Sequence, residues 1–110
     1  MSNYKILIVD DLVESLKVIV LHLQRSNPEY TLYQSNSSVK AIEIAQKVLP
    51  DLIITDWDMP EINGIELIRK LKSIESTTNI PFVVASGVMI TSNNLKVALE
   101  AGAVDFLRKP

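Results

Sequence analysis

Acidic, hydroxyl and amino side chains follow short apolar runs at four places in the sequence. Asp10 and Asp11 come after the first run and Asp56 after the third, while Ser86 and Lys109 come after the last two. Three carboxylates in one place would repel one another unless a hard cation neutralised them, and Mg²⁺ prefers oxygen ligands. An ammonium group and a hydroxyl can hold the oxygens of a phosphoryl group. If the fold gathers these side chains, an aspartate among them is placed to attack phosphorus and form an acyl phosphate.

The apolar pattern alternates between two periods along the chain. Short runs rich in Ile, Val, Leu and aromatic residues, each of strand length, cover residues 4–9, 30–33, 52–55, 82–85 and 104–107. Between them, apolar side chains recur at i, i+3, i+4 spacing within residues 12–23, 39–48, 65–71 and 95–101. The sequence therefore predicts five strands and four amphipathic helices.

Capping residues support these helix boundaries. Three helices follow residues that commonly cap helix N-termini, and one precedes a glycine of the kind that ends helices. These residues are Ser37 or Ser38 for the second helix, Asn63-Gly64 for the third, Ser92-Asn93 for the fourth, and Gly102 at the end of the fourth.

Strict alternation of strands and helices predicts an α/β fold, a doubly wound parallel sheet with helices on both faces. The first and third strand runs are apolar throughout, as buried central strands are. In such sheets the ligand site lies beyond the carboxyl ends of the strands, where the strand order reverses. We therefore expect the polar side chains that follow the strands to lie at one edge of the sheet.

Each of these residues also has a simpler interpretation. A single aspartate at a strand end is usually a turn former or a helix cap. Lys109 could be a solvated charge and Ser86 part of a turn, but polar residues at all four strand ends are harder to explain in this way. His22 is expected at the surface of the first helix, and Trp57 is expected to be a packing residue beside the site.

Composition excludes several classes of protein. The chain has 110 residues, a net charge of −2 and 47% hydrophobic residues, which fits one globular domain. It has no cysteine and one histidine, so thiolate sites, disulfides and multi-histidine metal sites are excluded. No apolar run approaches the ~20 residues that span a bilayer, and the scattered Lys and Arg give no footprint for nucleic acid. We therefore expect a cytoplasmic domain without direct nucleic-acid binding.

The whole chain resembles the receiver domain of bacterial two-component response regulators. The matching motifs are Ile8-Val9-Asp10-Asp11, Asp56-Trp57-Asp58-Met59-Pro60 with Asn63-Gly64, Ser86, and Ala101-Gly102-Ala103-Val104-Asp105-Phe106-Leu107-Arg108-Lys109-Pro110. The resemblance implies a flavodoxin-like sheet of strand order 2-1-3-4-5 and a single receiver domain over residues 1–110.

The resemblance also implies a role for each site residue. Asp56 is similar to the phospho-acceptor of these domains. The implied ligands of Mg²⁺ are Asp11, Asp56 and the backbone carbonyl of Asp58, with Asp10 acting through a water. Ser86 and Lys109 stand where receivers keep a hydroxyl residue and a lysine at the phosphoryl group. Phe106 stands at the switch aromatic, whose ring moves inward when the hydroxyl is recruited.

Two segments depart from the family pattern. The loop after Ser86 contains Val88, Met89 and Ile90, which either contact a partner or pack against the fourth helix. Receivers normally continue past the Lys-Pro pair into a fifth helix, and nothing follows Pro110 here. We expect the 110-residue chain to be truncated before that helix, and to be less stable than a longer form or to self-associate.

The leading hypothesis is a phosphoacceptor module and not an enzyme with its own substrate. A histidine kinase or phosphotransfer protein would phosphorylate Asp56, and the changed surface would bind a partner or control an unknown output domain. One alternative is an Asp-nucleophile phosphatase of the haloacid dehalogenase type, which Asp56-Trp57-Asp58 also fits. Those enzymes carry the motif on the first strand and need a cap domain, for which the chain has no room. The other alternative is a phosphorylation-independent interaction module.

Overall fold

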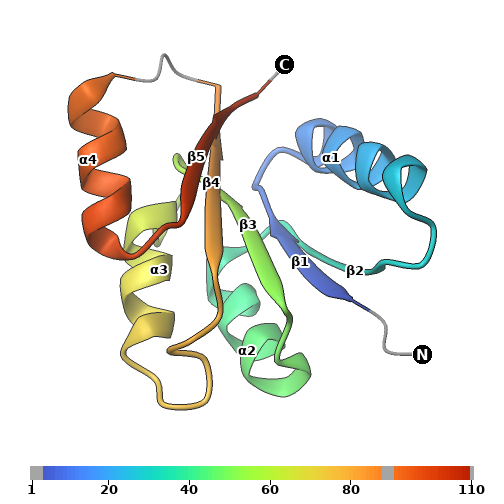
Figure 1. Ribbon diagram of the computed structural model, residues 1–110, viewed down its shortest axis with the longest axis horizontal. Helices are drawn as coiled ribbons and strands as arrows, with labels where there is room; N and C mark the ends of the chain where they lie inside the picture. Colours follow the sequence, from blue (N-terminus) through green and yellow to red (C-terminus); the bar gives the residue numbers. More distant parts are fainter. Residues whose placement is uncertain (1–3, 88–90, 110) are drawn as a thin grey trace.

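Five strands and four helices alternate along residues 4–87 and 91–109, the part of the chain that the computed structural model describes (Figure 1). In chain order they are β1 (Lys5–Val9), α1 (Val13–Ser26), β2 (Thr31–Ser35), α2 (Ser38–Val48), β3 (Leu52–Asp56), α3 (Gly64–Lys72), β4 (Phe82–Ser86), α4 (Ser92–Ala101) and β5 (Asp105–Arg108). The predicted sequence of elements is confirmed. The apolar loop residues Val88, Met89 and Ile90, for which two roles were expected, lie outside the described residues.

The strands form one parallel sheet in the order β2-β1-β3-β4-β5. This is the flavodoxin-like order that the family resemblance implied, and the expectation is confirmed. The strands that contain the apolar runs 6–9 and 52–54, β1 and β3, lie in the interior of the sheet, and Leu7, Ile8 and Ile53 are fully buried. The strand order reverses between β1 and β3, so a site is expected at the carboxyl ends of these two strands.

Alternate residues of the strands face two separate cores. On one face, Ile6 and Ile8 of β1 pack with Leu16 and Val20 of α1. On the other face, Leu7 and Val9 of β1 belong to a larger core with residues of α2, α3 and α4. Figure 1 shows these three helices on the side of the sheet opposite α1. Among the described residues, α1 is therefore the only helix on its face of the sheet.

Side-chain caps fix three of the helix starts. Ser37 caps α2 by accepting a hydrogen bond from the Lys40 amide, and Asn63 forms a reciprocal capping box with Glu66 at the start of α3. The predicted cap of the fourth helix is wrong by one residue. Thr91 is the N-cap of α4, because its hydroxyl accepts from the Asn94 amide, and the helix begins at Ser92.

Gly102 ends α4 as predicted, in the left-handed conformation with φ 117°. This φ is one that glycine adopts without strain. The expected position of His22 is also confirmed, since it lies exposed on α1. None of the described helices is long and apolar enough to cross a membrane.

Candidate functional site

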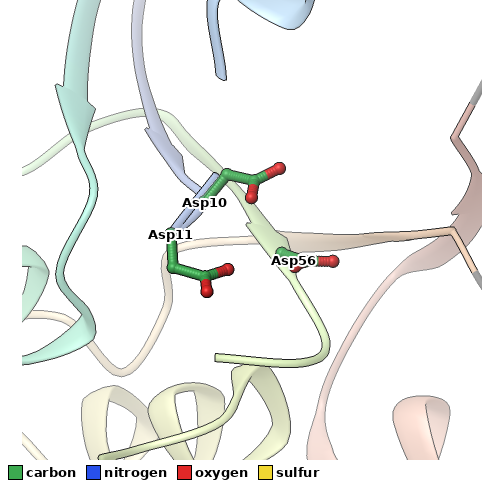
Figure 2. A group of neighbouring side chains, drawn as sticks. All are labelled: Asp10, Asp11 and Asp56. Atoms are coloured by element: carbon green, nitrogen blue, oxygen red, sulfur yellow. The ribbon is translucent and has the colours of Figure 1, made fainter. Parts of the chain in front are cut away.

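Three carboxylates meet where β1 and β3 end. Figure 2 shows Asp10 and Asp11 leaving the end of β1 and Asp56 at the end of β3. These strands are hydrogen-bonded neighbours, with Val9 opposite Thr55, so the three side chains converge. One carboxylate oxygen from each lies within 4.8 Å of the others. Asp10 and Asp56 are buried, with 0% and 6% of their surface exposed, while Asp11 is half-buried.

Lys109, which directly follows β5, neutralises part of the negative charge of these carboxylates. The parallel pairing of β4 with β5 continues through a hydrogen bond from the Lys109 amide to the Ser86 carbonyl, at 2.8 Å. The Lys109 Nζ lies 2.6 Å from Asp10 Oδ2 and 3.3 Å from Asp56 Oδ1. One ammonium group therefore bridges the carboxylates that end two neighbouring strands.

Burial and charge shift the pKa values of both partners. Burial raises the pKa of Asp56, and repulsion from Asp10 raises it further, although Lys109 partly offsets the effect. For Lys109, burial alone would lower the pKa, but the hydrogen bond to Asp10 and the attraction of Asp56 outweigh it, so its pKa is raised. The site therefore holds a charged lysine beside an Asp56 carboxylate whose negative charge is not fully compensated.

The residual negative charge fits a hard cation. Asp10 is already engaged on both oxygens, by Lys109 and by the Leu12 amide, which donates to its Oδ1 at 3.0 Å. Asp11 instead lines an open hollow of about 400 Å³ together with Asp58 and three neighbours. A second hollow of similar size contains Asp11, Asp56, Asp58 and Lys109. Carboxylate oxygens facing open, wet hollows are the donors that Mg²⁺ takes while it keeps several waters.

Gly64 holds the end of β3 against the start of α3. A Cβ atom at this position would lie 2.1 Å from the carbonyl oxygen of Asp56, far inside van der Waals contact. The Gly64 amide donates to the Trp57 carbonyl at 2.8 Å, which closes the turn after the acidic residue. Sequence reasoning placed Gly64 beside a helix cap and missed this contact, because no local pattern shows which backbone passes so close.

An aromatic contact links the site to the larger core. The ring of Trp57 lies against that of Phe106, with centroids 5.4 Å apart and planes inclined by 44°. Phe106 is only 5% exposed and belongs to the core on the α2–α4 face. Trp57 packs against the same core, which confirms the packing role expected for it.

The structure thus brings together most of the predicted site residues. The residues at the shared edge of the sheet are Asp10, Asp11, Asp56, Ser86, Lys109 and, lining the hollows, Asp58. Ser86 is buried at the end of β4, and its strand pairs with β3 so that Ala85 lies opposite Asp56. Phe106 stands apart from them, behind Trp57 in the core.

A parallel sheet of this order with an acidic cluster and a bridging lysine at its carboxyl edge defines a class of signalling domains, and comparison with known proteins agrees. The model of the response regulator receiver domain matches residues 6–110, and the chain belongs to this family, which acts in two-component phosphorelay signalling.

Among curated relatives, the phosphate regulon transcriptional regulatory protein PhoB of Pseudomonas aeruginosa is 35% identical over the whole chain. The sporulation initiation phosphotransferase F of Bacillus subtilis is 31% identical, also over the whole chain. The chain spans 47% of the first protein and 85% of the second.

Solved structures agree on the fold. The N-terminal domain of a response regulator receiver protein from Methanoculleus marisnigri is 27% identical with a TM-score of 0.88, and a response regulator from Chloroflexus aurantiacus is 28% identical with a TM-score of 0.90. Each comparison covers 99% of this chain, and 86% and 87% of the solved chains respectively. Membership of the receiver family sets aside the phosphatase of haloacid dehalogenase type considered from the sequence.

Proposed function

We propose that the domain accepts a phosphoryl group on Asp56 in a Mg²⁺-dependent reaction. The observation that carries the proposal is the bridging position of Lys109, 2.6 Å from Asp10 and 3.3 Å from Asp56 at the edge of an open hollow. In the transfer, an Asp56 oxygen forms the new bond to phosphorus while the donor's bond to phosphorus breaks. Asp56 is assigned as the nucleophile because it lines the open hollow 3.3 Å from Lys109, whereas both oxygens of Asp10 already accept hydrogen bonds.

The other residues then have separate roles. Asp11, Asp56 and the backbone carbonyl of Asp58 would hold Mg²⁺, and Asp10 would act through a water. The ion would neutralise negative charge on the phosphoryl oxygens. The Lys109 ammonium would bind a phosphoryl oxygen and keep the site electrically balanced when the new charge arrives.

Ser86 and Phe106 are proposed to carry the change away from the site. Ser86 is buried at the end of β4, directly after Ala85, which lies opposite Asp56, and this position supports the proposal that its hydroxyl follows a phosphoryl oxygen. Phe106 lies two residues before Arg108, the β5 partner of Ser86, and packs on Trp57 directly after Asp56. A movement of either side chain would therefore change the part of the domain around β4 and β5.

The proposed phosphodonor is a histidine kinase or a phosphotransfer protein. Proteins named for both activities match this chain. They include the sporulation initiation phosphotransferase F and a protein described as Histidine kinase P4 from Formosa agariphila, which is 35% identical to this chain. The output domain or protein is unknown, and the proposal includes no direct contact with nucleic acid or membrane. It places the domain in the cytoplasm, where a kinase has access to ATP.

The test is phosphorylation by acetyl phosphate with and without Mg²⁺, followed by intact mass. We expect one added phosphoryl group that requires Mg²⁺ and disappears in Asp56→Asn. Asp51→Asn is the matched control, because Asp51 directly precedes β3 at its opposite end. Equal labelling of Asp56→Asn would contradict the assignment. A parent protein that takes no phosphoryl group would favour the phosphorylation-independent interaction module.

A further inference from the structure

Ser15, in the first turn of α1, faces the same hollow as the acidic site. This half-buried side chain lines the hollow of about 400 Å³ together with Asp56, Lys109 and Asp58. It also lines an adjoining hollow of about 210 Å³ with Lys109 and Val18. Ser15 therefore stands where the phosphoryl site opens toward the α1 face of the sheet.

Hydrolysis of a phosphoryl group on Asp56 requires water on one particular side. The attacking water must lie roughly in line with the Asp56–phosphorus bond and opposite the Asp56 oxygen, so it approaches across the hollow. Most of the lining is unsuited to hold it there. Asp11 and Lys109 are engaged in the roles proposed above, Leu12 is apolar, and Gly87 has no side chain.

Among the described residues that line the hollow, two side chains remain that can hydrogen-bond to such a water, Asp58 and Ser15. Asp58 is exposed and follows Asp56 by two residues on the same connection, so it approaches from the side of β3. Ser15 comes from a different element, the helix that borders the other side of the hollow. A serine hydroxyl both donates and accepts, so it can orient a water toward phosphorus without adding negative charge.

We propose that Ser15 positions the water that hydrolyses phospho-Asp56, and this inference rests on the proposed function. The water oxygen forms a bond to phosphorus as the bond between phosphorus and the Asp56 oxygen breaks. The products are the free Asp56 carboxylate and dihydrogen phosphate, which keeps both protons of the water. The Ser15 hydroxyl holds the water and is itself unchanged.

The experiment compares Ser15→Thr with Ser15→Val, which have nearly the same shape and similar helix propensity but differ in the hydroxyl. Each variant is phosphorylated with acetyl phosphate and Mg²⁺, freed of donor, and followed by intact mass. We expect Ser15→Val to lose its phosphoryl group about fivefold more slowly than Ser15→Thr, a ratio that corresponds to about 1 kcal/mol, the usual net value of one hydrogen bond. Ser15→Thr should stay close to the parent.

A purely structural effect of the substitution would also change metal binding. The Mg²⁺ dependence of Trp57 fluorescence is therefore measured in both variants and should be the same. Equal lifetimes in Ser15→Thr and Ser15→Val, with normal phosphorylation, would overturn the role of Ser15 and leave the proposed function standing. Absence of phosphorylation in the parent protein would overturn both.

Discussion

At the scale of single residues, the structure makes Lys109 and Asp10 depend on one another. Asp10 is completely buried, and its short contact with the Lys109 ammonium is what compensates its charge in the absence of metal. A buried carboxylate that loses its partner is left with an uncompensated desolvation cost. The ion pair therefore serves the fold as well as the chemistry.

The first prediction is that Lys109→Met destabilises the metal-free domain by about 3 kcal/mol, since it leaves the Asp10 and Asp56 carboxylates unpaired. Mg²⁺ should restore part of the loss, because the cation takes over the neutralisation. Urea denaturation in EDTA and in Mg²⁺ measures both effects. The control is Lys96→Met, which removes an exposed ion pair with Glu100 at 3.9 Å and should change stability by less than about 0.5 kcal/mol. A Lys109→Met protein as stable as the parent in EDTA would contradict the prediction.

The second prediction concerns Asp56 and pH. Its pKa in the folded domain is raised above the ordinary value of 3.8 by burial and by Asp10. Well below pH 3.8 the Asp56 carboxyl is protonated in both the folded and the unfolded chain, so its ionisation does not change the free energy of unfolding. As pH rises from 3.8 to the raised folded pKa, the unfolded chain loses its proton first, so the folded state loses stability relative to it until Asp56 is ionised in both. Asp56→Asn should therefore melt above the parent at pH 7 without metal.

The measurement is a series of thermal melts between pH 4 and pH 8 with EDTA or Mg²⁺. The advantage of Asp56→Asn should grow with rising pH and then level off, and Mg²⁺ should shrink it by stabilising the parent. An advantage that is constant over this range would show that the ionised carboxylate is not its cause.

At the scale of elements, the connection from β3 to α3 fixes where the phospho-acceptor points. The capping box of Asn63 and Glu66 starts the helix, and Gly64 lets it begin in contact with the Asp56 carbonyl. Movement of α3 away from β3 would shift both the carbonyl of Asp56 and the turn that presents Asp58. This connection is therefore part of the site, and it also carries Asp58, which lines both hollows.

The third prediction uses two glycines that flank the same site. Gly64→Ala places a methyl 2.1 Å from the Asp56 carbonyl oxygen, so the backbone must move, and we expect a loss of about 2–3 kcal/mol and slower phosphorylation. The Cβ of Gly87→Ala meets no atom of the described residues within 4 Å, so this variant should keep both properties close to the parent. Chemical denaturation and acetyl phosphate labelling check the pair. Equal behaviour of the two variants would refute the close approach at Gly64.

Most of the elements could be predicted from the sequence because their signals are local. Short apolar runs, helical spacing and capping residues indicate the strands and helices, and the rule for parallel sheets then places the polar strand ends at one edge. The error at the start of α4 has a local cause as well, since Thr91, Ser92 and Asn93 are all good caps and only the geometry selects Thr91.

The contacts that the sequence did not reveal join residues of different elements. The Lys109–Asp10 pair spans 99 positions, and nothing near either residue identifies the other. The Trp57–Phe106 contact and the packing of Gly64 under Asp56 depend in the same way on how the strands and helices come together. The family resemblance supplied the roles of these residues, whereas the distances between them came only with the fold.

At the scale of the whole molecule, the two faces of the sheet are covered unequally. Residues of three helices pack on one face, whereas among the described residues α1 alone packs on the other. Beside α1 a mainly apolar hollow of about 200 Å³ is lined by residues of α1, β3, β4 and β5. Leu107 of β5 lines it and is 49% exposed, and Val18 of α1 is 44% exposed. A further segment packed here would bury side chains that now face water.

Such a segment would contribute heavily to stability. An amphipathic helix of three turns would cover on the order of 300 Å² of apolar surface, which at about 25 cal/mol per Å² corresponds to about 7 kcal/mol before entropy is subtracted. This chain covers 86% and 87% of the two solved receivers compared above, so each of them contains residues without a counterpart here. We therefore predict that a form extended by about fifteen native residues, roughly four turns of helix, is markedly more stable than residues 1–110, or that the short form self-associates through the α1 side.

Leu107→Lys makes this prediction specific to the face. In residues 1–110 the new charge replaces a half-exposed leucine and should change stability little if the protein is monomeric, or disperse the oligomer if it is not. In the extended form the same lysine would lie under the added segment and should lower the free energy of unfolding by about 2 kcal/mol or more.

Val104→Lys is the matched control, because Val104 is also exposed but does not line the hollow. Its effect on stability should therefore not depend on chain length. Thermal melts and sedimentation of both forms measure these effects. Two results together would show that the sheet is complete without a further helix. The short form would be monomeric with the same melting temperature as the extended form, and Leu107→Lys would lower the stability of both forms equally.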